Sequence, residues 1–265
     1  MRRSPLMYPI AHAWLIQRLV PDATPAHYLG CVWPDMLYDS PLTHPQSHRS
    51  GRLLAERTRG MADANIAEVV RAFVVGALSH GSEPRGFDWY SDEEYGGQPG
   101  AARGFAFQHG LALADETAEA CGIDRALGWW KAHNVVEMAC ERPLYAANPA
   151  LGERLAAACA DAPLRATVAG FLAGVFGVPA DALAAPMRRF AGVVALRPAS
   201  HAALAEVYAL QVRLKHPGAT PDVDALAGLI ARAERAIAPE VEGYLDTCTR
   251  LVGEMLRGEM GGEID

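Results

Sequence analysis

Lysine is almost absent from this chain of 265 residues, which contains only Lys131 and Lys215. Arginine supplies the remaining basic charge, and 31 acidic residues against 24 basic ones give a formal net charge of −7. A surface that binds nucleic acid through its phosphates is normally basic. The charge balance therefore argues against a nucleic-acid-binding protein.

Paired cysteines and long apolar runs are also lacking. The five cysteines are scattered and include no Cys-x-x-Cys pair, which favours reduced, buried thiols over a disulfide framework. No segment reaches the roughly 18 to 20 apolar residues of a membrane span. Near the N-terminus His12, Gln17 and Arg18 interrupt any signal-like apolar stretch. We therefore expect no membrane span and a cytoplasmic location.

Several common catalytic motifs are missing. The sequence contains no His-Glu-x-x-His, no adjacent His-Asp, no Glu-x-x-His and no Gly-x-Ser-x-Gly. It also lacks the glycine-rich loops that hold phosphates of mononucleotides and dinucleotides. These absences narrow the range of possible chemistry more than any single residue does.

Apolar residues recur at helical spacing almost throughout, and alternating strand-like runs are absent. We therefore predict a single all-α domain over residues 1–265, with a metal-site half at about 8–141 and a helical C-terminal half at about 150–257. Residues that favour the start of a helix are found at Thr24-Pro25, Ser200 and Thr220-Pro221. The segment from Pro143 to Pro149 indicates a break between helices. The helical segments are 12–20, 62–79, 105–121, about 125–141, 151–160, 163–176, 180–195, 200–214 and 222–257.

The histidines and carboxylates of the first half are the main functional indication. They lie in or beside apolar, helical segments, where a buried polar group without a partner costs several kcal/mol. A metal ion satisfies several such groups at once, and mixed nitrogen and oxygen ligands suit zinc, with manganese or iron as alternatives. The candidate ligands are His12, Asp35, His48, His80, Asp88, His133 and Glu137.

His133 and Glu137 are spaced i, i+4, which places both side chains on one helical face. The alternative is a hydrogen-bonded pair on a solvated face. His80 ends the apolar segment 62–79 and precedes an acidic loop that supplies Asp88 and Asp92. Its alternative role is a charge that caps the helix C-terminus.

The remaining candidates also have ordinary explanations. His12 opens the first helix and suits a core histidine equally well. Asp35 follows Pro34 and can simply cap the next turn, and Asp39 competes with it. His44 and His48 lie four residues apart in a polar segment, and the sequence leaves open which of them is the ligand.

Taken in order, these segments resemble the zinc-dependent phospholipase C family, whose fold is shared with single-strand-specific zinc nucleases. The resemblance covers roughly residues 8–141, and the order of the segments is more specific than any one of them. The matching segments are 9–15 (Pro-Ile-Ala-His-Ala-Trp-Leu), 28–35 (Tyr-Leu-Gly-Cys-Val-Trp-Pro-Asp), Ser47-His48, 73–80 (Phe-Val-Val-Gly-Ala-Leu-Ser-His) and 133–137 (His-Asn-Val-Val-Glu).

The resemblance implies an all-helical fold and two or three zinc ions bound by the candidate ligands. This chain departs from the family in two places. The secreted enzymes bind one ion through a mature N-terminal tryptophan, for which this sequence shows no equivalent. The family also has an aspartate four positions after the residue that matches His80, where this chain has Pro84. Asp88 is the substitute we predict, with Asp92 as the alternative.

The function implied by the resemblance is metal-dependent hydrolysis of a phosphoester, with a small-molecule or lipid substrate. Asp35 is the candidate catalytic residue, because a carboxylate near a metal-bound water can orient it or accept its proton. Trp89 and Tyr90, in the irregular stretch 81–104, are candidate substrate contacts, with Tyr95 beside them, although these rings can equally anchor the loop to the core.

Three alternatives remain open. One is a structural metal site, another is a specialised non-hydrolytic biosynthetic role, and the last is a helical interaction module without metal. The abundance of apolar helices is also compatible with a homodimer.

Overall fold

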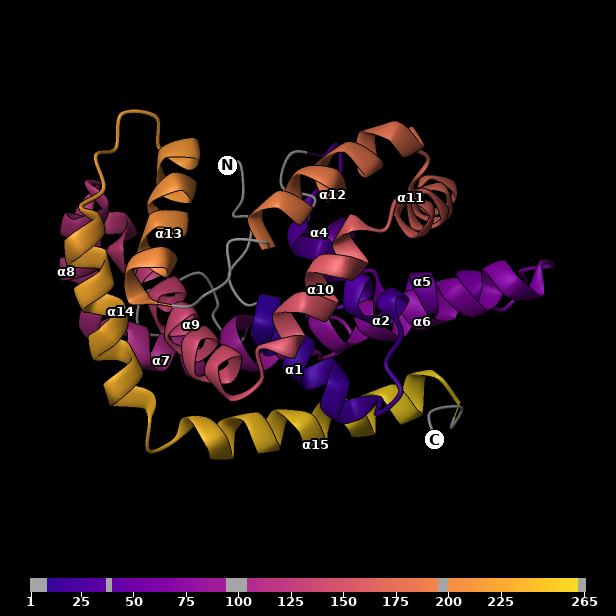
Figure 1. Ribbon diagram of the computed structural model, residues 1–265, viewed down its shortest axis with the longest axis horizontal. Helices are drawn as coiled ribbons and strands as arrows, with labels where there is room; N and C mark the ends of the chain where they lie inside the picture. The colour runs from indigo at the N-terminus through magenta and orange to yellow at the C-terminus, as the bar shows by residue number, and fades with distance from the viewer. Residues whose placement is uncertain (1–8, 37–39, 94–103, 195–199, 262–265) are drawn as a thin grey trace.

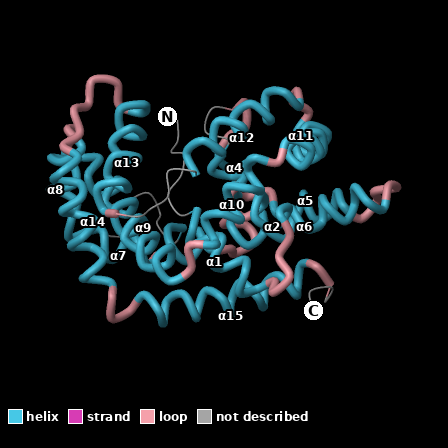
Figure 2. The backbone as a smooth tube through the Cα atoms, in the orientation of Figure 1, coloured by secondary structure: helices cyan, strands magenta, loops and turns pink. Residues whose placement is uncertain are grey.

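The computed structural model describes residues 9–36, 40–93, 104–194 and 200–261. Throughout these residues the regular structure is helical and no strand occurs (Figures 1 and 2), which confirms the all-α prediction. The α-helices are α1 (Pro9–Leu19), α2 (Pro25–Gly30), α3 (Trp33–Met36), α4 (His44–His48), α5 (Gly51–Thr58), α6 (Ala64–His80), α7 (Phe105–Gly110), α8 (Ala114–Cys121), α9 (Gly128–Ala147), α10 (Ala150–Ala160), α11 (Ala162–Phe176), α12 (Ala180–Val194), α13 (His201–Lys215), α14 (Val223–Ile237) and α15 (Val241–Glu259). Three short turns complete the list: a π-helical turn, Trp89–Glu93, and the 3₁₀ turns Leu111–Leu113 and Arg125–Leu127.

Local polar residues explain where several helices begin. Ser200 accepts a hydrogen bond from the backbone N–H of Ala203 and so caps α13, as predicted. Thr24 precedes Pro25 at the start of α2, also as predicted. The Ser200 hydroxyl thereby satisfies a backbone donor that has no partner inside the helix.

Proline positions account for two errors in the predicted boundaries. The break expected to start at Pro143 is wrong, because α9 continues to Ala147 with Pro143 inside it. The segment 222–257 is two helices, α14 and α15, which are separated around Pro239, a residue with no backbone N–H for helical pairing.

Two further boundaries differ from the predictions. Residues 105–121 form two helices joined by a 3₁₀ turn instead of one continuous helix. The cap of α14 is Asp222, whose side chain accepts from the backbone N–H of Ala225, and not Thr220-Pro221. The carboxylate lies directly before the first helical residue, where a cap is needed.

Helices α2 and α6 are held in close contact by two glycines. A Cβ atom added to Gly30 would lie 2.0 Å from the carbonyl oxygen of Phe73, and one added to Gly76 would lie 2.3 Å from that of His27. Both distances are too short for any side chain, so the backbones meet directly. This contact fixes the C-terminal end of α6, where His80 lies, against the segment that leads to α3.

Helix α9 is the central element of the core. Every residue from Lys131 to Glu141 is buried, including the five polar or charged residues Lys131, His133, Asn134, Glu137 and Glu141. At its far end the Glu141 carboxylate accepts hydrogen bonds from the backbone N–H groups of Ile10 (3.0 Å) and Ala11 (2.8 Å). These bonds join the N-terminus of α1 to α9 and so position His12.

The remaining helices flank this centre on both sides (Figure 1). Helices α7, α8, α13 and α14 gather on one side, and α10, α11 and α12 lie on the other with α5 and α6. Helix α15 runs along one edge of the molecule from α14 toward α5 and α6.

All five cysteines are free and buried, as predicted. Among the described residues, no single helix has the length and apolarity to cross a membrane, although α10 and α11 meet that test as a pair bent by 66°.

Candidate metal centre

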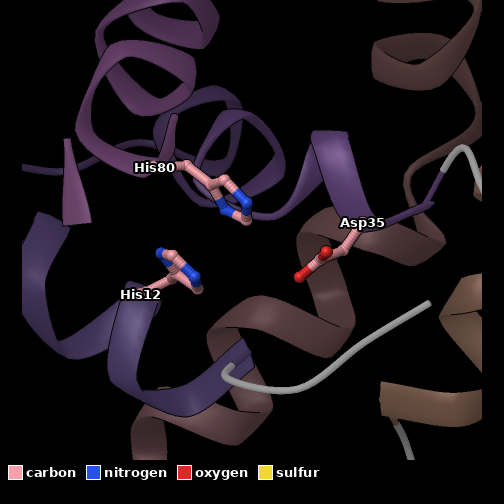
Figure 3. A group of neighbouring side chains, drawn as sticks. All are labelled: His12, Asp35 and His80. Carbon is pink, nitrogen blue, oxygen red and sulfur yellow. The ribbon is translucent and has the colours of Figure 1, made fainter. Parts of the chain in front are cut away.

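Four helices direct candidate ligands toward one another. His12 comes from α1, Asp35 from α3, His48 from α4 and His80 from the last turn of α6. Figure 3 shows His12, Asp35 and His80 directed toward one another from three separate segments. One ligand atom from each of these three residues lies within 4.8 Å of the other two. Residues 68 positions apart in the sequence therefore meet in one group.

His80 is oriented by a backbone contact. Its Nδ1 donates a hydrogen bond of 2.7 Å to the carbonyl oxygen of Cys31, so its Nε2 faces the candidate ligands. Imidazoles that bind metals commonly donate their other ring nitrogen to a carbonyl or carboxylate in this way. The side chain of His80 is fully buried, which keeps this orientation fixed.

Asp88 lies between three imidazoles. Its Oδ2 is 3.1 Å from His80 Nε2 and 3.7 Å from His48 Nε2, and its Oδ1 is 3.5 Å from His12 Nε2. Asp35 Oδ1 also lies 3.7 Å from His48 Nε2. Three of these four separations, at 3.5 to 3.7 Å, exceed a normal hydrogen bond and lie at or slightly above the roughly 3.3 to 3.6 Å between ligands on one tetrahedral zinc ion.

Two pairs of alternative ligands that the sequence left open occupy different positions in the structure. His48 joins a group with His80 and Asp88, whereas His44 stacks on the ring of His48 at 3.8 Å and belongs to no such group among the residues that the structure describes. Asp88 takes the place near His80, and Asp92 belongs to a different group. Asp39, the competitor of Asp35, lies outside the described residues.

The second group consists of Asp92, His133 and Glu137, and its ligand atoms also lie within 4.8 Å of one another. His133 Nε2 and Glu137 Oε1 are 4.0 Å apart on consecutive turns of α9, as their spacing predicts. Asn134 Nδ2 donates to the same His133 Nε2 at 2.6 Å and to Glu137 Oε2 at 3.3 Å. An ion bound through His133 Nε2 would therefore displace this amide.

Burial and neighbouring charge shift the pKa values around Asp88 in opposite directions. Burial, followed by the charge of His80, lowers the pKa of His12 to about 3, so His12 is neutral and its ring can bind a cation. Burial also opposes protonation of His80, but Asp88 outweighs it and raises the pKa of His80 to about 9. His80 in turn lowers the pKa of Asp88, although burial acts against ionisation.

The second group brings the carboxyl groups of Asp92 and Glu137 together in a largely buried part of the protein. Burial raises the pKa of Glu137 well above its usual value, and nearby Asp92, Asp88 and Asp35 raise it further. Burial, with the charge of Lys131, lowers the pKa of His133 to about 3. In such a group each carboxylate disfavours the ionisation of the others, and the imidazole is neutral. A bound divalent cation would offset the repulsion between the carboxylates and could be bound by the neutral imidazole.

Trp89 and Tyr90, the predicted substrate contacts, lie at a separate cavity of about 650 Å³. The Arg85 guanidinium stacks over the Trp89 ring at 4.6 Å. Helix α15 also lines this cavity, through residues that include Met255. None of the seven candidate ligands lines this cavity, so contact of these rings with a metal-bound substrate stays a prediction. Tyr95 lies outside the described residues.

A comparison with family models finds no match, and comparisons with curated proteins and with solved structures find no significant similarity. The resemblance to zinc-dependent phospholipase C therefore rests on the residues of the sequence alone.

Two participants were not predicted as part of the site. Asn134 adjoins His133 in sequence, and an amide beside a candidate ligand was the available indication. The role of the Cys31 carbonyl could not be inferred from the sequence, because any residue at that position offers the same backbone oxygen.

Proposed function

We propose that this protein is a metal-dependent hydrolase of phosphoesters that holds two or three ions, with zinc as the preferred metal. The observation that supports it most strongly is Asp88, whose two carboxylate oxygens lie 3.1 to 3.7 Å from three imidazole nitrogens contributed by three helices. The mixed nitrogen and oxygen ligand set is the one zinc favours.

Two adjoining ligand groups share His80: His12 with Asp35, and His48 with Asp88. The Asp92, His133 and Glu137 group supplies the third position. When bound, such ions supply Lewis acidity and a water of lowered pKa for attack on phosphorus.

Asp35 is the residue to which we assign the proton transfer. Its side chain is 17% exposed and so borders both the buried imidazoles and solvent. A carboxylate in that position can orient an attacking water and accept its proton. His12 and His80, which stack at 3.9 Å, hold the opposite side of the group.

Turnover of simple phosphoesters by zinc-loaded protein tests this proposal. We expect hydrolysis of a chromogenic phosphodiester or of phospholipid by wild-type protein, loss of activity in Asp35→Asn, and retention in Asp246→Asn, an exposed carboxylate on α15. Metal-loaded protein that hydrolyses none of a panel of phosphomonoesters, phosphodiesters and phospholipids would refute the hydrolase and leave a structural or non-hydrolytic metal site.

A further inference from the structure

The cavity of about 650 Å³ beside Trp89 and Tyr90 is separate from the candidate metal centre, because none of the seven candidate ligands lines it. Its lining comes from three parts of the chain: the start of α5 with the residue that follows α4, the segment from Ser82 to Tyr90, and the last turns of α15. Sites for small molecules typically measure about 300 to 1,000 Å³. The cavity is therefore large enough for a small organic ligand.

Ser82 brings to this cavity a hydroxyl group without a partner. The residue is 3% exposed, and its Oγ forms no hydrogen bond with any residue that the structure describes. Its backbone is held in place, since its N–H donates to the carbonyl oxygen of His48 at 2.9 Å. A buried hydroxyl without a partner destabilises the fold, and a ligand in the cavity would supply the missing hydrogen bond.

Arg85 brings to the cavity a positive charge that no carboxylate neutralises. Its guanidinium lies over the Trp89 ring, 4.6 Å from the centroid, and forms no ion pair within the described part of the chain. Stacking on a ring leaves the N–H groups at the edge of the guanidinium plane available. These groups bind a phosphate or a carboxylate through two parallel hydrogen bonds.

Two of the three carboxylates that line the cavity are already paired with arginines. Glu259 accepts a hydrogen bond from Arg52 Nε at 2.8 Å, and Glu254 accepts one from Arg250 on the same helix at 3.0 Å. Glu83 is the lining carboxylate that forms no ion pair with a described residue. The charge of Glu83 would oppose a bound anion, so removal of that charge reveals the sign of the ligand.

Apolar surface adjoins these charged groups. Trp89, Tyr90 and Met255 are partly buried and line the same cavity. Aromatic side chains pack well against rings, and the flexible thioether of methionine adapts to their shape. The cavity thus offers apolar contacts to the body of a ligand whose charged group binds the arginine.

We propose that this cavity binds a small organic anion, in which a phosphate or carboxylate group is attached to a ring, at a site separate from the candidate metal centre. The anionic group binds Arg85 and the Ser82 hydroxyl, and the ring packs against Trp89, Tyr90 and Met255. The inference does not depend on the proposed hydrolase, because no candidate metal ligand takes part in the binding.

Calorimetric titration of the full chain with phenylphosphonate, which has no hydrolysable ester bond, tests the site. The titration is made on zinc-loaded protein and repeated after chelation, so that binding to an ion is separated from binding to the cavity. We expect a Kd of about 1 mM or below in both. Benzoate in place of phenylphosphonate distinguishes carboxylate from phosphate as the preferred group.

Two charge variants should change the affinity in opposite directions. Arg85→Gln should weaken phenylphosphonate binding about tenfold or more, because it removes a charge-assisted hydrogen-bond donor. Glu83→Gln should strengthen binding about twofold or more, because it removes a like charge. Arg57→Gln is the matched control, since this exposed arginine of α5 does not line the cavity, and it should stay within about twofold of wild type.

The charge variants can also overturn the proposal. Equal affinity in wild type and Arg85→Gln, or tighter binding of benzylammonium than of phenylphosphonate, would show that the cavity does not recognise an anion. Should chelation unfold the chain, the comparison of wild type with Arg85→Gln in the zinc-loaded protein still decides the question.

Two further variants test the hydroxyl and the ring. Ser82→Ala should weaken phenylphosphonate binding about threefold or more and leave the Tm unchanged, because the hydroxyl has no partner to lose in the free protein. Wild type should bind phenylphosphonate about fivefold or more tightly than methylphosphonate, and Trp89→Leu should reduce this preference. Equal affinity of wild type for the two phosphonates would refute recognition of a ring.

Discussion

Asp88 Oδ2 lies 3.1 Å from Nε2 of His80, whose other ring nitrogen is held by a backbone carbonyl. The imidazole is therefore fixed, and Asp88 comes to it from the turn that follows α6. This relationship places a carboxylate at the centre of the histidine group. In the zinc-dependent phospholipase C family, which the sequence resembles, the aspartate lies four positions after the matching histidine, where this chain has Pro84.

We predict that Asp88→Asn weakens zinc binding at least tenfold, because the amide removes a negative charge that faces three imidazoles. Competition with a chromogenic chelator measures the affinity. Asp246→Asn, an exposed carboxylate on α15, is the control and should bind zinc as wild type does. Unchanged affinity in Asp88→Asn would show that Asp88 is not a ligand.

Removal of metal should destabilise the fold. Without a cation, the buried carboxylates near Glu137 are left with mutual repulsion. A ligand present at 100 times its Kd raises the free energy of unfolding by about 2.7 kcal/mol. For a chain of this size that increase corresponds to a rise in Tm of about 5 to 10 °C. Calorimetry before and after chelation measures the shift. Zinc should restore the Tm and magnesium, which prefers all-oxygen sites, should not. A Tm unaffected by chelation and by zinc contradicts this.

Glu141 should give the stability a specific pH dependence. Burial raises its pKa to about 8 in the folded protein, against the opposing effect of the backbone N–H groups of Ala11 and Ile10. The folded state therefore binds this proton more tightly than the unfolded state does. Its contribution to stability is present at low pH and is lost as the pH rises toward 8, with a slope of up to about 1.4 kcal/mol per pH unit.

Denaturant unfolding of wild type and Glu141→Gln between pH 5 and 8, at one fixed metal content, isolates this group. The variant carries no titrating proton at position 141, so its stability should fall less steeply over the same interval. Parallel pH profiles would show that Glu141 titrates normally in the fold.

The contact between α2 and α6 should tolerate no side chain at Gly76. We expect Gly76→Ala to lower the free energy of unfolding by about 1 to 3 kcal/mol, because the new Cβ would meet the carbonyl oxygen of His27. Gly170→Ala in α11, where nothing lies within 4 Å, should instead stabilise by about 0.5 to 1 kcal/mol through helix propensity. Denaturant titration compares the two, and equal effects would contradict the close packing.

The sequence predicted the helical class and most helix positions because apolar spacing and caps such as Ser200 are local properties. It misplaced boundaries at Pro143 and Pro239, since a proline's effect on a helix depends on the packing around it. Spacing alone paired His133 with Glu137, because both lie on one helix.

The longer-range contacts could not be read from spacing. Which of Asp88 and Asp92 reaches His80 depends on the path of the turn after α6, and no local rule fixes that path.

Metal stoichiometry is the most direct test of the central claim. Protein purified without chelator and dialysed against zinc should hold at least two tightly bound ions per chain by elemental mass spectrometry, with the loss of one or more in His80→Ala. Wild-type protein that is folded and holds no zinc, manganese or iron after the same treatment would contradict the metal centre and every function proposed for it.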